Sequence, residues 1–401
     1  MLGEDGSDTN FGLDNSGGAM ATLRGGAFTG NGGTEAWGIL NTDGGTTLEA
    51  DGVTATGNHG SNRNLGLNNG GSARAILRGG SFTGNGGGEA WGILNTDDGT
   101  TLDADDVAAL AEGDNATNFG LDNSGSAQAT LRGGSCTARG GTSNYGIFTH
   151  DEGTTLEASN VAALAEHGSF INFGIENHDN GVAILRNGSF TGRGGAHTAG
   201  AQNTLTATLT VEGITALGEY GSSTNYGLLN QTNTTATLCN SAFTGRGGTD
   251  AFGIYNTENG TTLEAASVTA LGEDGDNFSH GLFNNLGAAA TLRGGAFTGR
   301  GGAETGGINN ADTGTILEAE NVTVRGENAS SINRGMINEN GATATADNSQ
   351  FTGDAGNGLY LNGGAMSLGV CQLDGDATRR SSGALICFQV YDGSYNAYTC
   401  P

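Results

Sequence analysis

The chain has 401 residues, of which 77 are glycine and one is proline, so it is glycine-rich without being collagen-like. Its 42 acidic residues outnumber its 15 basic residues, all arginine, and leave a formal net charge of −27 at pH 7. This charge argues against nucleic acids and anionic membrane surfaces as partners, because their phosphates would be repelled. No apolar run approaches the roughly 18 residues of a membrane-spanning helix, so we expect no membrane insertion.

The first residues already belong to a repeat. Met1 is followed by "LGEDGSDTNFGL", which is similar to "LGEYGSSTNYGL" at 217–228 and "LGEDGDNFSHGL" at 271–282. With no signal peptide ahead of it, we expect the chain to be part of a longer protein. A leucine in "TLRGG" or "TLEA" then recurs at steps that alternate between about 25 and 29 residues, which makes a two-coil unit of about 54 residues.

Each coil of about 27 residues holds three short pieces in which apolar residues alternate with others. The first piece surrounds the leucine, as at Leu23. The second is represented by Phe28-Thr29, and the third is Gly-Ile/Leu-x-Asn, as at 38–41. Such short pieces predict strands rather than helices. Three strands per coil, with no room for a helix, predict a parallel β-solenoid of about 14 coils.

Two columns of side chains are expected to point into this solenoid. The first is an apolar stack that begins with Phe28, Val53, Phe82 and Val107. The second consists of the asparagine that ends each third strand, whose side chain can satisfy the polar groups of stacked turns. Members of this predicted asparagine ladder include Asn41, Asn69, Asn95 and Asn123.

The short strands, the asparagine ladder and the Gly-Ile/Leu-x-Asn pattern resemble the right-handed parallel β-helix proteins of the pectate-lyase-like superfamily. In character the chain is most similar to the bacterial surface and autotransporter-passenger members, which are rich in Gly, Thr and Asn. The resemblance covers about residues 1–374 and implies an all-β, right-handed fold with three strands per coil. The catalytic motifs of the polygalacturonase-like members do not match: "NTD" at 41–43 belongs to a repeating turn, Gly-His-Asp is missing, and Arg-Ile-Lys needs a lysine. No cofactor is implied.

The repeat stops after residue 374, where the composition changes. We therefore predict β-helix repeats at 1–374 and a capping segment at 375–401 that closes one end of the core. The amino-terminal coil shows no cap. We expect either a preceding segment to cover it or a second copy to stack on it, which would produce a homo-oligomer or filament.

The residue after each repeated leucine is expected to point outwards and alternates in charge. This predicted ion ladder reads Arg24, Glu49, Arg78, Asp103, Arg132 and Glu157. At an interstrand spacing of ~4.8 Å, opposite charges on successive coils would hold near-identical coils in register. A catalytic arginine beside acidic groups is the alternative, but nothing distinguishes one arginine from the others.

Leu229, Tyr255 and Phe283 occupy the outward position x of Gly-Ile/Leu-x-Asn on three consecutive coils. Stacked apolar side chains on an exposed face indicate a contact patch for a partner or for a sugar ring. A loop folded over these three residues is the alternative interpretation.

Two histidine–aspartate pairs follow the same turn position on successive coils: His150-Asp151 and His178-Asp179. We expect these four side chains to lie in one small surface region, where they would bind a divalent metal or supply an acid–base pair. Thr149 interrupts the asparagine ladder nearby, and such departures from a repeat are expected at functional sites. Ordinary solvation of polar turn residues is the alternative.

The five cysteines fall into two groups. Cys136 replaces a core phenylalanine and is expected to be buried, whereas Cys239 replaces an outward arginine. Cys371, Cys387 and Cys400 lie close together near the end of the sequence, where one disulfide would staple the cap in an oxidising compartment. We favour Cys387–Cys400, and the other two pairings stay open.

Even repetition without catalytic motifs favours a secreted or cell-surface β-helical rod with a structural or adhesive role and no catalysis. The alternative is a carbohydrate-binding or polysaccharide-degrading β-helix protein. It would use either the patch at Leu229, Tyr255 and Phe283 or the histidine–aspartate cluster, with a glycan as its partner.

Overall fold

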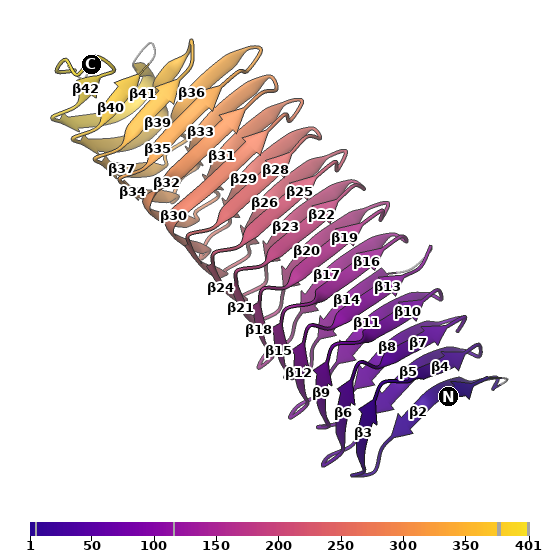
Figure 1. Ribbon diagram of the computed structural model, residues 1–401. Coiled ribbons are helices and arrows are strands. Elements are labelled where there is room, and N and C mark those ends of the chain that lie inside the picture. The colour runs from indigo at the N-terminus through magenta and orange to yellow at the C-terminus, as the bar shows by residue number, and fades with distance from the viewer. Residues whose placement is uncertain (5, 115–116, 375–377, 399–401) are drawn as a thin grey trace. The chain divides into compact units, whose positions relative to one another are not determined.

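A computed structural model describes residues 1–4, 6–114, 117–374 and 378–398. It divides the chain into two compact units. Unit 1 contains Met1–Thr198 and Ala207–Leu209, and unit 2 contains Ala199–Thr206 and Thr210–Pro401. Each unit is built from parallel strands stacked turn upon turn (Figure 1), with about 13 turns in all. The described residues form no helix. They therefore contain no long apolar helix that could cross a membrane. The predicted all-β parallel β-helix is confirmed.

Each turn of unit 1 contains one long strand and two short strands. The long strands are β2 (Thr9–Asn15), β5 (Glu35–Asn41), β8 (Arg63–Asn69), β11 (Glu89–Asn95), β14 (Thr117–Asn123), β17 (Ser143–Thr149) and β20 (Ile171–Asn177). The first short strands are β3 (Met20–Arg24), β6 (Thr47–Asp51), β9 (Arg74–Arg78), β12 (Thr101–Asp105), β15 (Gln128–Arg132), β18 (Thr155–Ser159) and β21 (Val182–Arg186). The second short strands, after the two-residue β1 (Leu2–Gly3), are β4 (Ala27–Asn31), β7 (Thr54–Asn58), β10 (Ser81–Asn85), β13 (Ala108–Glu112), β16 (Ser135–Arg139), β19 (Ala162–Glu166) and β22 (Ser189–Arg193).

The same order continues in unit 2, and the division between the units falls within β23 (His197–Asn203) and β24 (Thr208–Glu212). The long strands that follow are β26 (Thr224–Gln231), β29 (Asp250–Thr257), β31 (Phe278–Asn285), β33 (Glu304–Ala311), β36 (Ile332–Glu339) and β39 (Asn357–Gly369). The other strands are β25 (Thr215–Glu219), β27 (Thr235–Cys239), β28 (Ala242–Arg246), β30 (Thr262–Glu273), β32 (Ala289–Arg300), β34 (Ile316–Glu320), β35 (Thr323–Glu327), β37 (Thr343–Asp347), β38 (Gln350–Gly353), β40 (Gln372–Asp374), β41 (Thr378–Phe388) and β42 (Tyr391–Asp392).

The core alternates large and small side chains from one turn to the next. Phe28 lies opposite Ala55, and Ala55 lies opposite Phe82 on the following turn. The predicted stack of Phe28 directly on Val53 is therefore wrong, although Val53 is fully buried beside it. A phenylalanine over an alanine fills the space between turns, whereas two phenylalanines would overfill it. This complementarity explains why the sequence repeats every two coils.

The asparagine ladder is confirmed in both units. In unit 1, the Asn15, Asn41, Asn69 and Asn95 side-chain amides each donate to the amide oxygen of the next asparagine, at 2.7–2.8 Å, ending at Asn123. In unit 2 the same bonds of 2.7–2.9 Å link six residues: Asn203, Asn230, Asn256, Asn284, Asn310 and Asn338. Each amide also donates to a backbone carbonyl of a neighbouring strand, as Asn41 does to Arg74 at 3.0 Å. The ladder therefore supplies hydrogen bonds that buried polar turns require.

Thr149 interrupts this ladder, and its buried hydroxyl has no hydrogen-bond partner. Replacing Thr149 with asparagine is expected to raise the free energy of unfolding by about 1 kcal/mol, because Asn123 would regain an amide acceptor. Urea unfolding measures the change, with Thr130→Asn on an outward position of β15 as the control. A loss of stability in Thr149→Asn would contradict this explanation.

The predicted ion ladder is wrong in its register. Because Leu23 lies opposite Ala50 rather than Leu48, the strands are offset by two residues from the predicted alignment. The observed outward column reads Arg24, Asp51, Arg78, Asp105, Arg132 and Ser159. The predicted members Glu49, Asp103 and Glu157 stand in the neighbouring column, opposite threonine and isoleucine. Arg132 still forms ion pairs with Asp103 and Asp105, but these exposed pairs contribute little stability.

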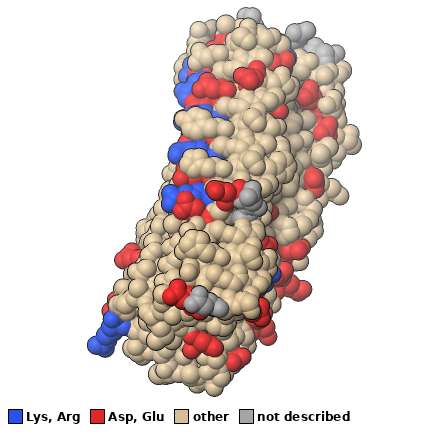
Figure 2. All heavy atoms as spheres, turned by 90° about the vertical axis from the view of Figure 1, so that its right-hand side faces the viewer, with Lys and Arg blue, Asp and Glu red and all other residues tan. Residues whose placement is uncertain are grey.

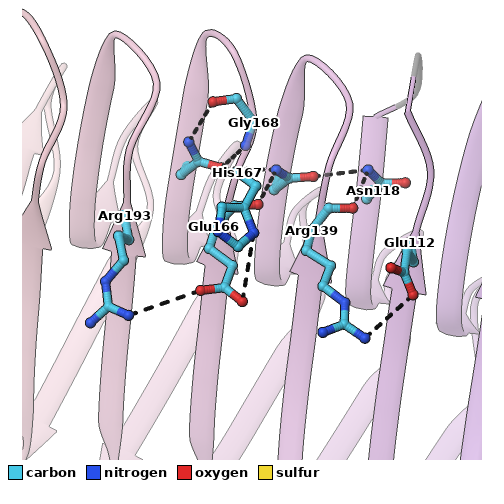
Figure 3. A network of polar contacts seen from close by, with 9 residues as sticks. Glu112, Asn118, Arg139, Glu166, His167, Gly168 and Arg193 are labelled. Atoms are coloured by element: carbon cyan, nitrogen blue, oxygen red, sulfur yellow. Dashed lines mark hydrogen bonds and ion pairs between the residues drawn. The ribbon is translucent and has the colours of Figure 1, made fainter.

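A different ion ladder runs along the ends of the second short strands. In unit 1, Arg139 pairs with Glu112 at 3.3 Å and Arg193 with Glu166 at 4.0 Å (Figure 3). In unit 2, Glu219, Arg246, Glu273 and Arg300 form consecutive ion pairs. Arginine and acidic side chains alternate along one edge of the face seen in Figure 2.

Glu273 is the central carboxylate of this ladder in unit 2. Burial alone would raise its pKa, but hydrogen bonds from Arg300 and Arg246 outweigh burial, and the pKa is lowered. We predicted that the charged column at Arg24 would hold the coils in register. The ladder through Glu273 is better suited to that role, because the Glu273 carboxylate is nearly inaccessible to solvent.

Parallel pairing continues past the predicted boundary at residue 374. β41 pairs in parallel with β39, and β42 pairs with β40. The last segment therefore adds strands to the stack. Whether it also closes the end of the core stays a prediction.

Candidate functional site

Three consecutive long strands of unit 2 shape a concave outer face: β26 ("TNYGLLNQ"), β29 ("DAFGIYNT") and β31 ("FSHGLFNN"). The glycine in each strand is required, because a Cβ at Gly253 would lie 2.4 Å from the backbone nitrogen of Leu271. The residue before the glycine and the second residue after it then meet on the outside. In β29 these are Phe252 and Tyr255, whose ring centroids are 5.0 Å apart.

Stacking of the strands turns these positions into two aromatic columns. In the first column, Tyr226 stacks on Phe252 at 5.7 Å between centroids, and Phe252 stacks on His280 at 5.9 Å. In the second column, Tyr255 lies 5.2 Å from Phe283. Ring pairs of this kind contribute about 0.5–1.5 kcal/mol beyond the area that they bury. The two columns therefore form a rigid aromatic face.

This face borders a groove of about 600 Å³, which we call the unit 2 groove. The volume lies within the range of roughly 300–1,000 Å³ usual for small-molecule sites. Polar and aromatic side chains from later turns complete its wall: Glu304, Asn309, Arg334, Glu339 and Tyr360.

Four polar atoms of the groove are buried without a hydrogen-bond partner among the described residues. They are Oδ1 of Asp250, Nδ1 of His280, Oδ1 of Asn309 and Nε of Arg334. The backbone of Gly306 lies beside the His280 ring and partly opposes the effect of burial on its pKa, although Nδ1 forms no full hydrogen bond. Unsatisfied buried groups cost about 1–3 kcal/mol each. Four such atoms in one groove are expected where a polar ligand or ordered water supplies the missing hydrogen bonds.

The charged groups of the unit 2 groove are tuned by burial and by each other. Burial raises the pKa of Asp250 and lowers the pKa of His280 to about 4, so His280 is neutral at pH 7. The Arg334 guanidinium pairs with Glu304 at 3.4 Å and lies 4.3 Å from the centre of the Tyr360 ring. This end of the groove therefore offers a fixed cation against an aromatic face.

The structure brings part of the predicted contact patch into this site. Tyr255 and Phe283 line the groove, whereas Leu229 is buried beside them and does not line it. The sequence analysis missed the first aromatic column. Its signal is an aromatic residue directly before the repeated glycine: Phe11, Trp37, Trp91, Phe119, Tyr145, Phe173, Tyr226 and Phe252.

The two predicted histidine–aspartate pairs lie near each other in unit 1. His150 contacts Asp151 at 3.2 Å through Nδ1, and His178 lies 3.7 Å from Asp179. The Phe148 ring neighbours both imidazoles, at 4.4 and 5.9 Å between centroids. The other His150 nitrogen, Nε2, faces Asp122 at 3.2 Å.

Burial would lower the pKa of His150, but Asp122 and Asp151 outweigh it and raise the pKa. Both ring nitrogens are thus engaged by carboxylates, which leaves neither free to bind a metal. Within the part of the chain that the structure describes, no three His, Cys, Asp or Glu side chains are arranged to hold a metal ion. The geometry gives no support to the predicted divalent-metal site. The acid–base alternative stays a prediction.

The cysteines differ in their surroundings. Cys136 is buried, and burial raises the pKa of its thiol to about 12, which makes it unreactive. Cys239 is partly exposed, and Cys371 is a buried free thiol. Cys387 is disulfide-bonded. Because Cys400 lies outside the described residues, the Cys387–Cys400 pairing stays a prediction.

No family model matches the sequence, and no curated protein shows significant similarity to it. Three solved structures with a similar fold are distant in sequence, at 9–14% identity. One is the Vag8–C1 inhibitor complex, with 14% identity, a TM-score of 0.47, and coverage of 96% of this chain and 90% of the other. Another is the TibC-catalysed hyper-glycosylated fragment of TibA, with 14% identity, a TM-score of 0.22, and coverage of 95% and 99%. A third is PfbA, a surface adhesin of Streptococcus pneumoniae, with 9% identity, a TM-score of 0.22, and coverage of 96% and 88%. At these scores the likenesses carry no argument about function.

Proposed function

We propose that this protein is an extracellular adhesive scaffold that binds a glycan in the unit 2 groove without cleaving it. The observation that carries the proposal is the combination of flat aromatic faces with unsatisfied polar atoms in one groove. A sugar ring has an apolar C–H face that packs on aromatic rings, and its hydroxyl groups both donate and accept hydrogen bonds. Tyr255 and Phe283 would receive the ring face, while Asp250 and Asn309 would accept from its hydroxyls.

Two features support a location outside the cell. The disulfide at Cys387 suits an oxidising compartment, because intracellular thiols are kept reduced. A net charge of −27 keeps the surface strongly hydrated, which suits a protein that must stay soluble while it presents a binding face.

Replacing Tyr255 with alanine is expected to weaken glycan binding at least tenfold, because the variant loses the ring at the centre of the aromatic face. A ligand is first identified on an array of neutral and acidic oligosaccharides, and its affinity for the full chain is then measured by calorimetry. Tyr395→Ala serves as the matched control, since Tyr395 is 77% exposed and does not line the unit 2 groove.

Equal affinities of Tyr255→Ala and the unaltered chain would overturn the assignment of the groove. Release of shorter sugars from the bound glycan would overturn the non-catalytic part of the proposal. End-to-end assembly of copies is a separate prediction, which light scattering across a range of concentrations tests directly.

A further inference from the structure

A second group of aromatic rings lies on the outer face of unit 1, on strands β14, β17 and β20. Phe119, Tyr145 and Phe148 are only partly buried, and their ring centroids lie 5.0–5.6 Å apart. Phe173 meets Tyr145 edge-on at 6.0 Å. These rings occupy the positions that border the groove in unit 2, so the two-column arrangement recurs here.

Glu176 stands among these rings and interacts electrostatically with His150 and Tyr145. It lies opposite Phe148 in the strand register and is 6% exposed. Its carboxyl group forms no hydrogen bond or ion pair with any residue that the structure describes. A buried carboxylate that lacks a counter-charge is strongly unfavourable. Burial raises the pKa of Glu176 to about 8 and outweighs the opposing effect of His150, so the carboxyl group is mostly protonated at pH 7 when nothing is bound.

The charges around Glu176 favour a cationic ligand over an anionic one. The nearest positive group, His150, is already held by Asp122 and Asp151 at 3.2 Å each. The three strands carry no lysine or arginine: β14 reads "TNFGLDN", β17 "SNYGIFT" and β20 "INFGIEN". The unit 2 groove differs in this respect, because Arg334 supplies a cation there.

We propose that Glu176, Tyr145 and Phe148 form a second binding site, which takes the ammonium group of an amino sugar. Glu176 would release its proton to solvent as the ammonium group binds and would then pair with it as a carboxylate, and the two ring faces would attract the same cation while they pack against the sugar. A neutral glycan would form no ion pair with Glu176 and would therefore bind less well. This site is independent of the unit 2 groove.

The experiment compares two probes on the full chain at pH 7 by calorimetry: a β-1,4-linked glucosamine trimer and its N-acetylated form. We expect the trimer with free amines to bind at least tenfold more tightly, and Glu176→Gln to abolish that difference. Glu157→Gln is the matched control, because Glu157 is an exposed carboxylate of the same unit on β18. Both tryptophans, Trp37 and Trp91, belong to unit 1, so a change in their fluorescence would report binding there.

Three results would overturn the proposal. The first is equal affinity for the two trimers, and the second is unchanged amine binding in Glu176→Gln. The third is amine binding that is lost in Tyr255→Ala but kept in Glu176→Gln, which would place the ligand in the unit 2 groove. Lysine methyl ester that binds as tightly as the trimer would contradict the amino-sugar part of the assignment.

Folding of the test variant can be verified separately. Glu176→Gln exchanges a carboxyl group for a neutral group of the same shape, so its melting temperature should not fall. If it does fall, Phe148→Leu keeps an apolar side chain at the neighbouring position and removes only the ring face. Several-fold weaker amine binding is expected in that variant, and unchanged binding would contradict the proposal.

Discussion

Replacing Phe243 with alanine is expected to lower the free energy of unfolding by about 3–5 kcal/mol. Phe243 is fully buried, and it lies between Ala216 on the preceding turn and Ala270 on the following turn. Neither alanine can move into the space that the ring vacates, so the cavity would remain open. Urea unfolding followed by circular dichroism measures the effect.

Tyr395→Ala provides the control for this experiment, because its side chain is 77% exposed and its loss should change stability by less than about 0.5 kcal/mol. A cost below about 1 kcal/mol for Phe243→Ala would show that the neighbouring turns collapse onto the gap. That result would contradict the large-over-small packing that we infer from the strand register. In a solenoid, where each turn contacts only its neighbours, a gap of this kind also weakens the coupling between turns.

Replacing Asn256 with alanine is expected to cost about 3 kcal/mol of unfolding free energy. Asn256 is fully buried and accepts a hydrogen bond of 2.8 Å from Asn230. It donates to the amide oxygen of Asn284 at 2.7 Å and to the Ala289 carbonyl at 3.1 Å. Alanine would leave both of these acceptors without this donor, in a position that water does not reach.

Asn259→Ala is the matched control for the ladder, since Asn259 is an exposed turn residue three positions further on. It should change stability by less than about 0.5 kcal/mol. A similarly small loss in Asn256→Ala would mean that ordered water replaces the missing amide. The ladder would then contribute to strand register more than to stability.

The strands and the inward asparagines could be predicted because their signals are local. Alternation of apolar and polar residues over five to seven positions defines a strand, as in β9 ("RAILR") or β11 ("EAWGILN"). An asparagine that ends every third strand must point inward to form hydrogen bonds with the turns above and below it. Asn41 and Asn95 were therefore recognisable as ladder residues from their spacing alone.

The candidate site was predictable only in part. Tyr255 and Phe283 stood out because they share one repeated position, which made them a recognisable column. Arg334 and Tyr360 occupy the same two repeated positions on later turns, but Gly306 separates Arg334 from the aromatic run, and Asn309 and Ile337 separate Tyr360 from it. Glu176 was recognisable only as an outward polar residue near the histidine–aspartate pairs, and the structure alone showed that it is buried opposite Phe148.

The amino-acid sequence by itself determined that this protein is a parallel β-helix with an asparagine ladder, since repeat length and strand alternation are read along the chain. Only the tertiary structure decided the register between turns. Aligning the repeated leucines puts Arg24 beside Glu49, but the fold puts Leu23 over Ala50 and Arg24 beside Asp51. The reason is physical: register depends on how side-chain volumes fit between turns about 27 residues apart, and that fit is a property of the packed core.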